Sequence, residues 1–366
     1  MGRRVGPQWH LTLGCKDPQR RGAATSQRPT RRATSRWRAV PPRGPAFGHP
    51  APSLPPVTRR GGLLFALMCV LWGLPYVLIK VAVQELSPPQ LVLLRTGLAA
   101  AVLLPYAAAR GQLAPVLAHW RPLLVFTALE LAVPWLLLAR AERELTSSLT
   151  GLLIAAVPLV AAFAARLGGS HEPLDSTRLA GLGIGFAGVA ALVGLDVRGG
   201  DRLAVAEVAV VVLCYAVAPL VVSRWLADVP AAGVTAAALA LTALVYAPFG
   251  APGLEVPSGR VVVAVVLLVG LCTVAALLAF FALIAEAGPQ RALVITFVNP
   301  AVALLLGILL LSEPFTLGAA IGFPLVLVGS VLATRRTRPE RPPASLAPSV
   351  TAAAGSGRPT APGDPG

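Results

Sequence analysis

Long apolar blocks dominate the middle of this chain. Between residues 62 and 334 the sequence divides into ten apolar runs, separated by short polar or Pro/Gly-rich breaks. A helix of about 20 apolar residues crosses the roughly 30 Å hydrocarbon layer of a bilayer. The pattern therefore predicts an all-α, polytopic membrane protein with ten transmembrane helices. We expect them at 62–84, 90–109, 122–141, 146–166, 176–195, 203–223, 231–250, 260–285, 290–311 and 316–334.

The second half of this core repeats the first. Residues 144–188 align with 286–329 with one residue of slack. The matched residues are Glu144 with Glu286, Pro158 with Pro300, Glu172-Pro173 with Glu313-Pro314, Gly181 with Gly322 and Gly188 with Gly329. Each half holds five spans, an odd number, so the second copy must enter the membrane from the opposite side. We expect two inverted five-helix repeats, at 62–195 and 203–334, with a cavity where they meet near the bilayer midplane.

Composition and charge agree with a membrane protein. The chain is 55% hydrophobic and 13% charged, with mean hydropathy +0.73. Its net charge of +15 is confined to the tails, because residues 62–334 carry thirteen basic and thirteen acidic side chains. A basic tail beside a membrane is typical of a flank attracted to anionic lipid. We therefore predict no nucleic-acid partner.

The two tails also bear on orientation. Residues 1–60 and 335–366 are rich in Arg, Pro and small residues without an apolar period, and we expect them to be disordered. Residues 1–60 are either a native extension or a misplaced start. Ten spans put both termini on one side, and the Arg-rich flanks predict that this side is the cytoplasm.

Two segments carry a family resemblance. They are WGLPYVLIKVAVQELSPPQLVLLRTGLAAAVLLP at 72–105 and GPQRALVITFVNPAVALLLGILLLSEPFTLGAAIGFPLVLVGSVLA at 288–333. The Trp-Gly pair, the Pro-then-Arg entry to the second span and the Asn-Pro then Glu-Pro pattern resemble EamA-type members of the drug/metabolite transporter superfamily. The resemblance implies a ten-helix fold of two inverted repeats, a bacterial inner membrane and export of small metabolites. It implies no particular substrate.

Glu130 is the sharpest candidate for a functional side chain. It lies about eight residues, or roughly 12 Å, into its span. An ionised carboxylate there would cost several kcal/mol if it faced lipid. Glu130 is therefore a ligand for a substrate cation, a proton-coupling site or a structural carboxylate. Pro134 cannot donate to the Glu130 carbonyl, which leaves either a free ligand oxygen or a simple kink.

Two basic and three aromatic residues are further candidates. Lys80 either snorkels to the outer interface or contacts substrate. Arg95 either snorkels in the same way or forms a structural ion pair or a gate. Trp72, Tyr76 and Trp135 either line a pocket for apolar or cationic solutes or pack and anchor the bundle.

The ninth span contains a polar break. Thr296, Asn299 and Pro300 either contact substrate or hold helices together, and Pro158 should bend the matching helix of the first copy similarly. The loop-end carboxylates Glu286 and Glu313 are best interpreted as helix caps or solvated charges. Three of the four cysteines lie in apolar runs without metal-ligand spacing, so we expect neither a metal nor another cofactor.

The function predicted from these patterns is secondary transport. We expect a small-molecule exporter, for amino acids or drug-like compounds, that works by alternating access of the two repeats. The sequence contains no Walker A motif, so uphill transport would need a proton or other ion gradient. The alternatives are a membrane-embedded enzyme, which would need clustered His, Asp and Glu, or a non-transporting receptor or scaffold.

Overall fold

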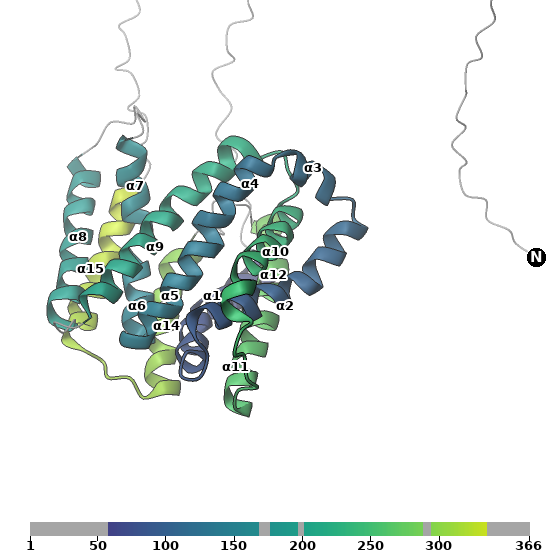
Figure 1. The fold of residues 1–366 in the computed structure, drawn as a ribbon. Helices are drawn as coiled ribbons and strands as arrows, with labels where there is room; N and C mark the ends of the chain where they lie inside the picture. Colours follow the sequence, from purple (N-terminus) through teal and green to yellow (C-terminus); the bar gives the residue numbers. More distant parts are fainter. Residues whose placement is uncertain (1–57, 168–175, 197–200, 288–293, 335–366) are drawn as a thin grey trace, which may run out of the picture. The chain divides into compact units, whose positions relative to one another are not determined.

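The computed structural model describes residues 58–167, 176–196, 201–287 and 294–334. The Glu172-Pro173 pair, residues 1–57 and residues 335–366 fall outside these ranges. The prediction of disorder up to residue 60 is wrong at its end, because α1 begins at Arg59. Every regular element in the described ranges is a helix (Figure 1). The first copy contains α1 (Arg59–Ala82), α2 (Pro88–Ala109), α3 (Leu113–Ala118), α4 (Trp120–Thr127), η1 (Ala128–Ala132), α5 (Val133–Glu144), α6 (Ser147–Ile154), α7 (Val157–Leu167) and α8 (Ser176–Asp196). The second contains α9 (Arg202–Val221), η2 (Val222–Leu226), α10 (Ala231–Gly250), α11 (Gly259–Val269), η3 (Gly270–Ala275), α12 (Ala276–Ala287), α14 (Ile295–Leu311) and α15 (Leu317–Thr334).

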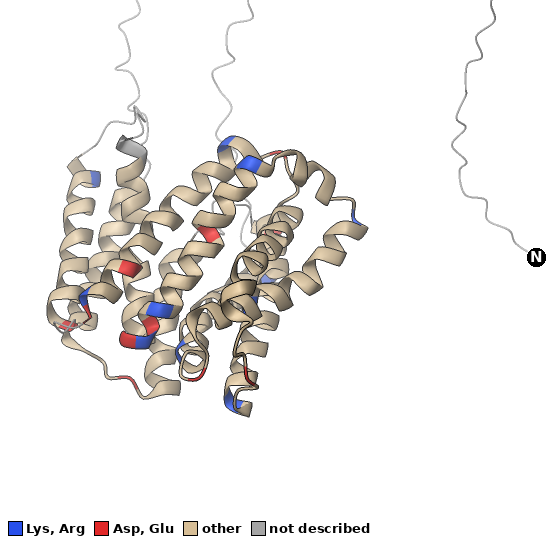
Figure 2. Ribbon diagram, viewed as in Figure 1, with Lys and Arg blue, Asp and Glu red and all other residues tan. Residues whose placement is uncertain are grey.

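Most of these helices are long enough to cross a bilayer. Within the described residues, nine helical stretches have the length and apolar composition of membrane spans. A further apolar helix, α14, has 17 described residues and follows directly on residues outside the description. Charged side chains are few along these helices (Figure 2). The prediction of an all-helical membrane protein is confirmed, and each predicted apolar run is mostly helical where it is described.

The matched helices α8 and α15 pack closely and antiparallel to one another. A Cβ atom on Gly188 would lie 2.8 Å from the Gly322 carbonyl oxygen, and one on Gly181 would lie 2.9 Å from the Gly329 oxygen. The reverse contacts are equally short, at 2.7 Å for both Gly322 and Gly329. Glycine is required here because any side chain would push the two backbones apart. The glycines that align in the two copies therefore contact each other crosswise.

Other matched features recur in the two copies. The spans Trp120–Glu144 and Gly259–Ala287 each contain a π-helical turn, beginning at Ala128 and Gly270, and the same offset relates Glu144 to Glu286. Gly111 and Gly253, also related by this offset, both have φ +65° at the end of a helix, a conformation that favours glycine. The helices α2 and α10 that precede them pack side by side over much of their length.

Pro158 and Pro300 lie at different positions in their helices, and a similar bend at both stays a prediction. A break at residues 155–156 separates α6 from α7, and Pro158 lies in the first turn after it. The described part of α14 runs uninterrupted through Pro300. Pro300 comes only five residues after the start of α14, so its missing N–H removes one bond from the second turn.

Two carboxylates join the ends of α1 to the ends of the helix formed by α11, η3 and α12. Glu85, after α1, accepts hydrogen bonds from the Ser258 N–H (2.7 Å) and hydroxyl (2.6 Å) at the start of α11. At the other end of the same helix pair, Glu286 accepts from the Thr58 hydroxyl at 2.6 Å. Each acidic group lies where a helix N-terminus attracts negative charge. α1 and the helix formed by α11, η3 and α12 are thus joined at both ends.

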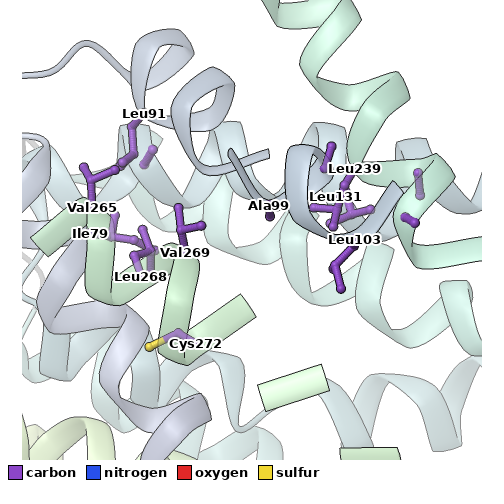
Figure 3. Packing of buried hydrophobic residues seen from close by; sticks show 14 of the residues in the cluster. Ile79, Leu91, Ala99, Leu103, Leu131, Leu239, Val265, Leu268, Val269 and Cys272 are labelled. Atoms are coloured by element: carbon purple, nitrogen blue, oxygen red, sulfur yellow. The ribbon is translucent and has the colours of Figure 1, made fainter. Parts of the chain in front are cut away.

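The interior is packed with aliphatic residues from both copies. Its largest cluster joins α1, α2 and η1 to α10, α11 and η3 (Figure 3). Large apolar side chains also point outward, including Leu244, Phe249 and Leu309, each at least 66% exposed. In water this exposure would be costly, whereas in a bilayer these side chains face hydrocarbon.

Candidate functional site

Arg95 lies inside the helical bundle. Its side chain is 8% exposed, and its guanidinium carbon is 3.5 Å from the centroid of the Trp135 ring. The Nε atom donates a hydrogen bond to the Thr273 hydroxyl at 3.3 Å. A guanidinium group is weakly hydrated and stacks on aromatic faces, so this environment stabilises its charge. The interpretation of Arg95 as a snorkelling residue is wrong, because α5 and η3 cover it.

At two of the π-helical turns, η1 and η3, a side-chain hydroxyl binds a backbone carbonyl. Thr273, in η3, donates to the Leu268 oxygen at 2.9 Å while it accepts from Arg95. Tyr246, on α10, donates to the oxygen of Ala132 at 2.9 Å, at the end of η1. Such π-helical turns are frequent at functional sites. Here one of them places a hydroxyl from the second copy against an arginine of the first.

Glu130 lies within η1, directly before the helix that carries Pro134. Its side chain is half-buried, and no hydrogen bond or ion pair holds its carboxylate within the described residues. The Glu130 carboxyl group lies within range of electrostatic interaction with Tyr215 and Cys214 of α9. At Pro134, where the sequence predicted a free carbonyl or a kink, the structure has the π-helical turn η1 directly before the helix that carries this proline.

Tyr215, which the sequence analysis missed, connects these groups. Arg95, Glu130 and Tyr76 all act electrostatically on its hydroxyl, and the Trp135 side chain lies beside it. Tyr215 sits on an apolar helix of the second copy, where its lone hydroxyl gave little signal among valine and alanine. We call Arg95, Trp135, Thr273, Glu130, Tyr215 and Tyr76 the central cluster.

Trp72 does not share the environment of Tyr76, although both are on α1. The Trp72 ring packs on Phe280 with centroids 4.8 Å apart, beside buried Met68. The Tyr76 ring instead faces Gly151, where a Cβ atom would lie 3.5 Å from its edge. Of the predicted aromatic residues, Tyr76 and Trp135 belong to the central cluster and Trp72 to a packing cluster.

The polar residues of α14 lie against α1. A Cβ atom on Gly73 would be 3.2 Å from the Asn299 backbone oxygen. The side-chain oxygen of Asn299 is buried and has no hydrogen-bond partner in the described part of the chain. Thr296 is half-buried and Pro300 is buried. The contact with Gly73 places Asn299 at the interface of α1 and α14.

Lys80 caps the C-terminal end of α5. Its ammonium group donates to the carbonyl oxygens of Glu142 at 2.7 Å and Leu145 at 2.8 Å, with Arg143 at 3.5 Å. A cation at a helix C-terminus satisfies carbonyls that have no partner in the helix. Lys80 is thus a helix cap in this structure, and its snorkelling to the outer interface stays a prediction.

Glu142 is a second residue that the sequence analysis missed. It is 0% exposed, and neither carboxylate oxygen has a hydrogen-bond partner in the described structure. The predicted span ended at residue 141, which left Glu142 in a turn, but α5 continues to Glu144. The helical spacing of Trp135, Leu138 and Glu142 was the signal that could have found it, since it puts them on one face.

Glu313 is a helix cap, which confirms the interpretation from sequence. Its two oxygens accept from the backbone N–H groups of Ser147 (2.8 Å) and Ser148 (2.9 Å), and from both hydroxyls. Ser312 turns the chain with φ +55°, which brings Glu313 back onto the start of α6.

Near the start of α11, the hydrogen bonds from Ser258 lower the pKa of Glu85 below its usual range.

These observations define a polytopic, all-helical membrane protein built from two similar halves, with a polar cluster shared between them. The sequence matches the EamA-like transporter family twice, over residues 59–194 and 203–335. The chain therefore belongs to the EamA-like transporter family, and the resemblance noted from its motifs is confirmed. No curated protein matches the sequence.

Eleven chains of known structure match this protein. One, described as "Crystal structure of protein", is 23% identical, with a TM-score of 0.52 over 75% of this chain and 96% of that chain. At this level of identity the likeness shows the fold alone.

Proposed function

We propose that the chain is a secondary transporter that exports small metabolites, such as amino acids or drug-like compounds, by alternating access. It would lie in a bacterial inner membrane with both termini in the cytoplasm. Membership of the EamA-like family supports this proposal. The crosswise glycine contacts of α8 and α15 support two inverted repeats of five helices each, because two matched helices related by an in-plane axis must be antiparallel.

The central cluster carries the proposal. Arg95 and Trp135 come from the first copy, and Thr273 and Tyr215 come from the second. When the two repeats rock against each other, contacts between them must change, whereas the stacking of Arg95 on Trp135 within one copy can persist. A site divided in this way opens to each side of the membrane in turn.

The chemistry of the cluster indicates a class of substrate. A guanidinium group offers several N–H donors in one plane and suits a carboxylate or phosphate. The half-buried carboxylate of Glu130 suits an ammonium group, and the rings of Tyr76, Trp135 and Tyr215 suit an apolar or aromatic side chain. A zwitterion with an apolar side chain would satisfy all of these groups.

Flux measurements with purified protein in liposomes test this function. A panel of radiolabelled amino acids and cationic dyes is presented, and we expect saturable uptake of at least one zwitterionic probe that empty liposomes lack. The Glu130→Gln variant should take up that probe at least about tenfold more slowly, as expected for a lost charged contact of about 1.4 kcal/mol or more. Absence of flux across the whole panel would favour the receptor or enzyme alternatives.

A further inference from the structure

The position of Glu142 is energetically unusual. Among the described residues, Glu142 is an acidic side chain with no exposed surface. Neither of its carboxylate oxygens has a hydrogen-bond partner in the described part of the chain. Burying an ionised carboxylate without a partner costs several kcal/mol, whereas a neutral carboxylic acid loses much less. The packing around Glu142 therefore suits a carboxyl group that holds a proton.

The nearby cations do not neutralise Glu142 in this arrangement. Lys80 directs its ammonium group at main-chain oxygens, including that of Glu142 itself at 2.7 Å, rather than at the carboxylate. Arg95 stacks on Trp135, and Arg140 is 2.7 Å from Glu207. The titratable and charged groups that face Glu142 or its helix are Lys80 and Tyr76 on α1, Arg95 on α2, Glu207 on α9 and Glu313 after α14.

Glu142 also lies beside the contacts that join α1, the α5–α6 turn and the α14–α15 link. It precedes by five residues the start of α6, which Glu313 from the second copy holds through Ser147 and Ser148. Lys80 of α1 binds the carbonyls on either side of the same turn. A charge that appears on Glu142 would attract Lys80 away from these carbonyls, which would loosen the contact between α1 and the α5–α6 turn.

We propose that Glu142 is the proton site that couples this transporter to a proton gradient. The inference rests on the proposed transport function and adds the coupling ion to it. In the arrangement seen here the carboxyl group carries a proton. When the repeats open, the O–H bond breaks, the proton passes to water, and Lys80 turns to the carboxylate and neutralises its charge. Rebinding of a proton from the opposite side completes the exchange for one substrate molecule.

Infrared spectroscopy tests the proton occupancy directly and needs no substrate. The full chain in lipid at neutral pH should show the C=O stretching band of a protonated carboxylic acid, with a shift in heavy water. We expect this band to be weaker in Glu142→Gln and unchanged in Glu144→Gln, which alters an exposed carboxylate two residues away. An unchanged band in Glu142→Gln would overturn the proposal.

Transport in the same liposomes tests the coupling. With an acidic lumen and a radiolabelled amino acid that shows flux, one-to-one exchange predicts accumulation up to about tenfold per pH unit. We expect Glu142→Gln to lose this accumulation while it still exchanges labelled for unlabelled probe, which also shows that it folds. Glu142→Asp, which keeps a carboxyl group, and Glu144→Gln should accumulate the probe.

Accumulation by Glu142→Gln equal to that of the wild type would overturn the proposal. If the wild type moves no probe at all, the transport function fails instead. The infrared result then still decides whether Glu142 holds a proton.

Discussion

Replacing Glu313 tests the contact between the α14–α15 link and the start of α6. Glu313→Ala removes the acceptor for two backbone N–H groups and two hydroxyls, on serines that are at most 4% exposed. The hydroxyls can rotate to other acceptors, but the two N–H groups at a helix start cannot. An unsatisfied buried donor costs about 1–3 kcal/mol, so we expect a loss of about 2–6 kcal/mol. Glu313→Gln keeps one acceptor oxygen and should lose about half as much.

Thermal unfolding of the purified protein in detergent measures this loss. In a chain of 366 residues each kcal/mol shifts the midpoint by less than the about 2–4 °C seen for 150–250 residues, so Glu313→Ala should lower the midpoint by on the order of 2 °C or more. The matched control is Glu144→Ala, which removes an exposed carboxylate. If Glu313→Ala and Glu144→Ala melt together, the hydrogen bonds at the start of α6 do not stabilise the protein as we argue.

Three further predictions follow from other contacts. Gly188→Leu should destabilise the protein strongly, because a Cβ atom there meets backbone of α15 at 2.7 Å, whereas Gly183→Leu meets open space and should melt as the wild type does. Arg95→Lys should reduce uptake at least about tenfold, because an ammonium group replaces neither the stacking on the indole nor the planar donors; uptake at wild-type rates would contradict this. The hydrogen bonds from Ser258 lower the pKa of Glu85 in the folded protein. The stability that Glu85 contributes is therefore present above its unfolded pKa and is lost as pH falls through its folded pKa. The melting point of Ser258→Ala should depend less on acidic pH than that of the wild type.

The membrane fold could be predicted because its signal is local. Each apolar run is long enough to cross a bilayer whatever its neighbours are, and no soluble helix needs such a length of apolar residues. The cap formed by Glu313 was predicted as one of two alternatives, a helix cap or a solvated charge, because a carboxylate at the end of a helix suits both. The prediction needed no knowledge of which helix it would cap.

The central cluster could be predicted only in part, because it depends on which helices meet. Arg95 and Lys80 near the start and end of their spans suggested snorkelling, and only the packing of α2 and α1 shows what covers them. The π-helical turns at Ala128 and Gly270 also escaped prediction, since a single added residue leaves apolar periodicity almost unchanged. Tyr215 and Glu142 became candidates only through their neighbours.

The most direct test of the account is the sidedness of two matched loops. Arg110 and Pro252 are exposed, follow the matched helices α2 and α10, and each lies next to a glycine with φ +65°. Single cysteines at these positions, in a chain whose four native cysteines are replaced by alanine, are treated with a membrane-impermeant thiol reagent in intact cells and in inverted vesicles. Inverted repeats predict that Arg110→Cys reacts only from the cytoplasmic side and Pro252→Cys only from the outside. Reaction of both from the same side would contradict the account.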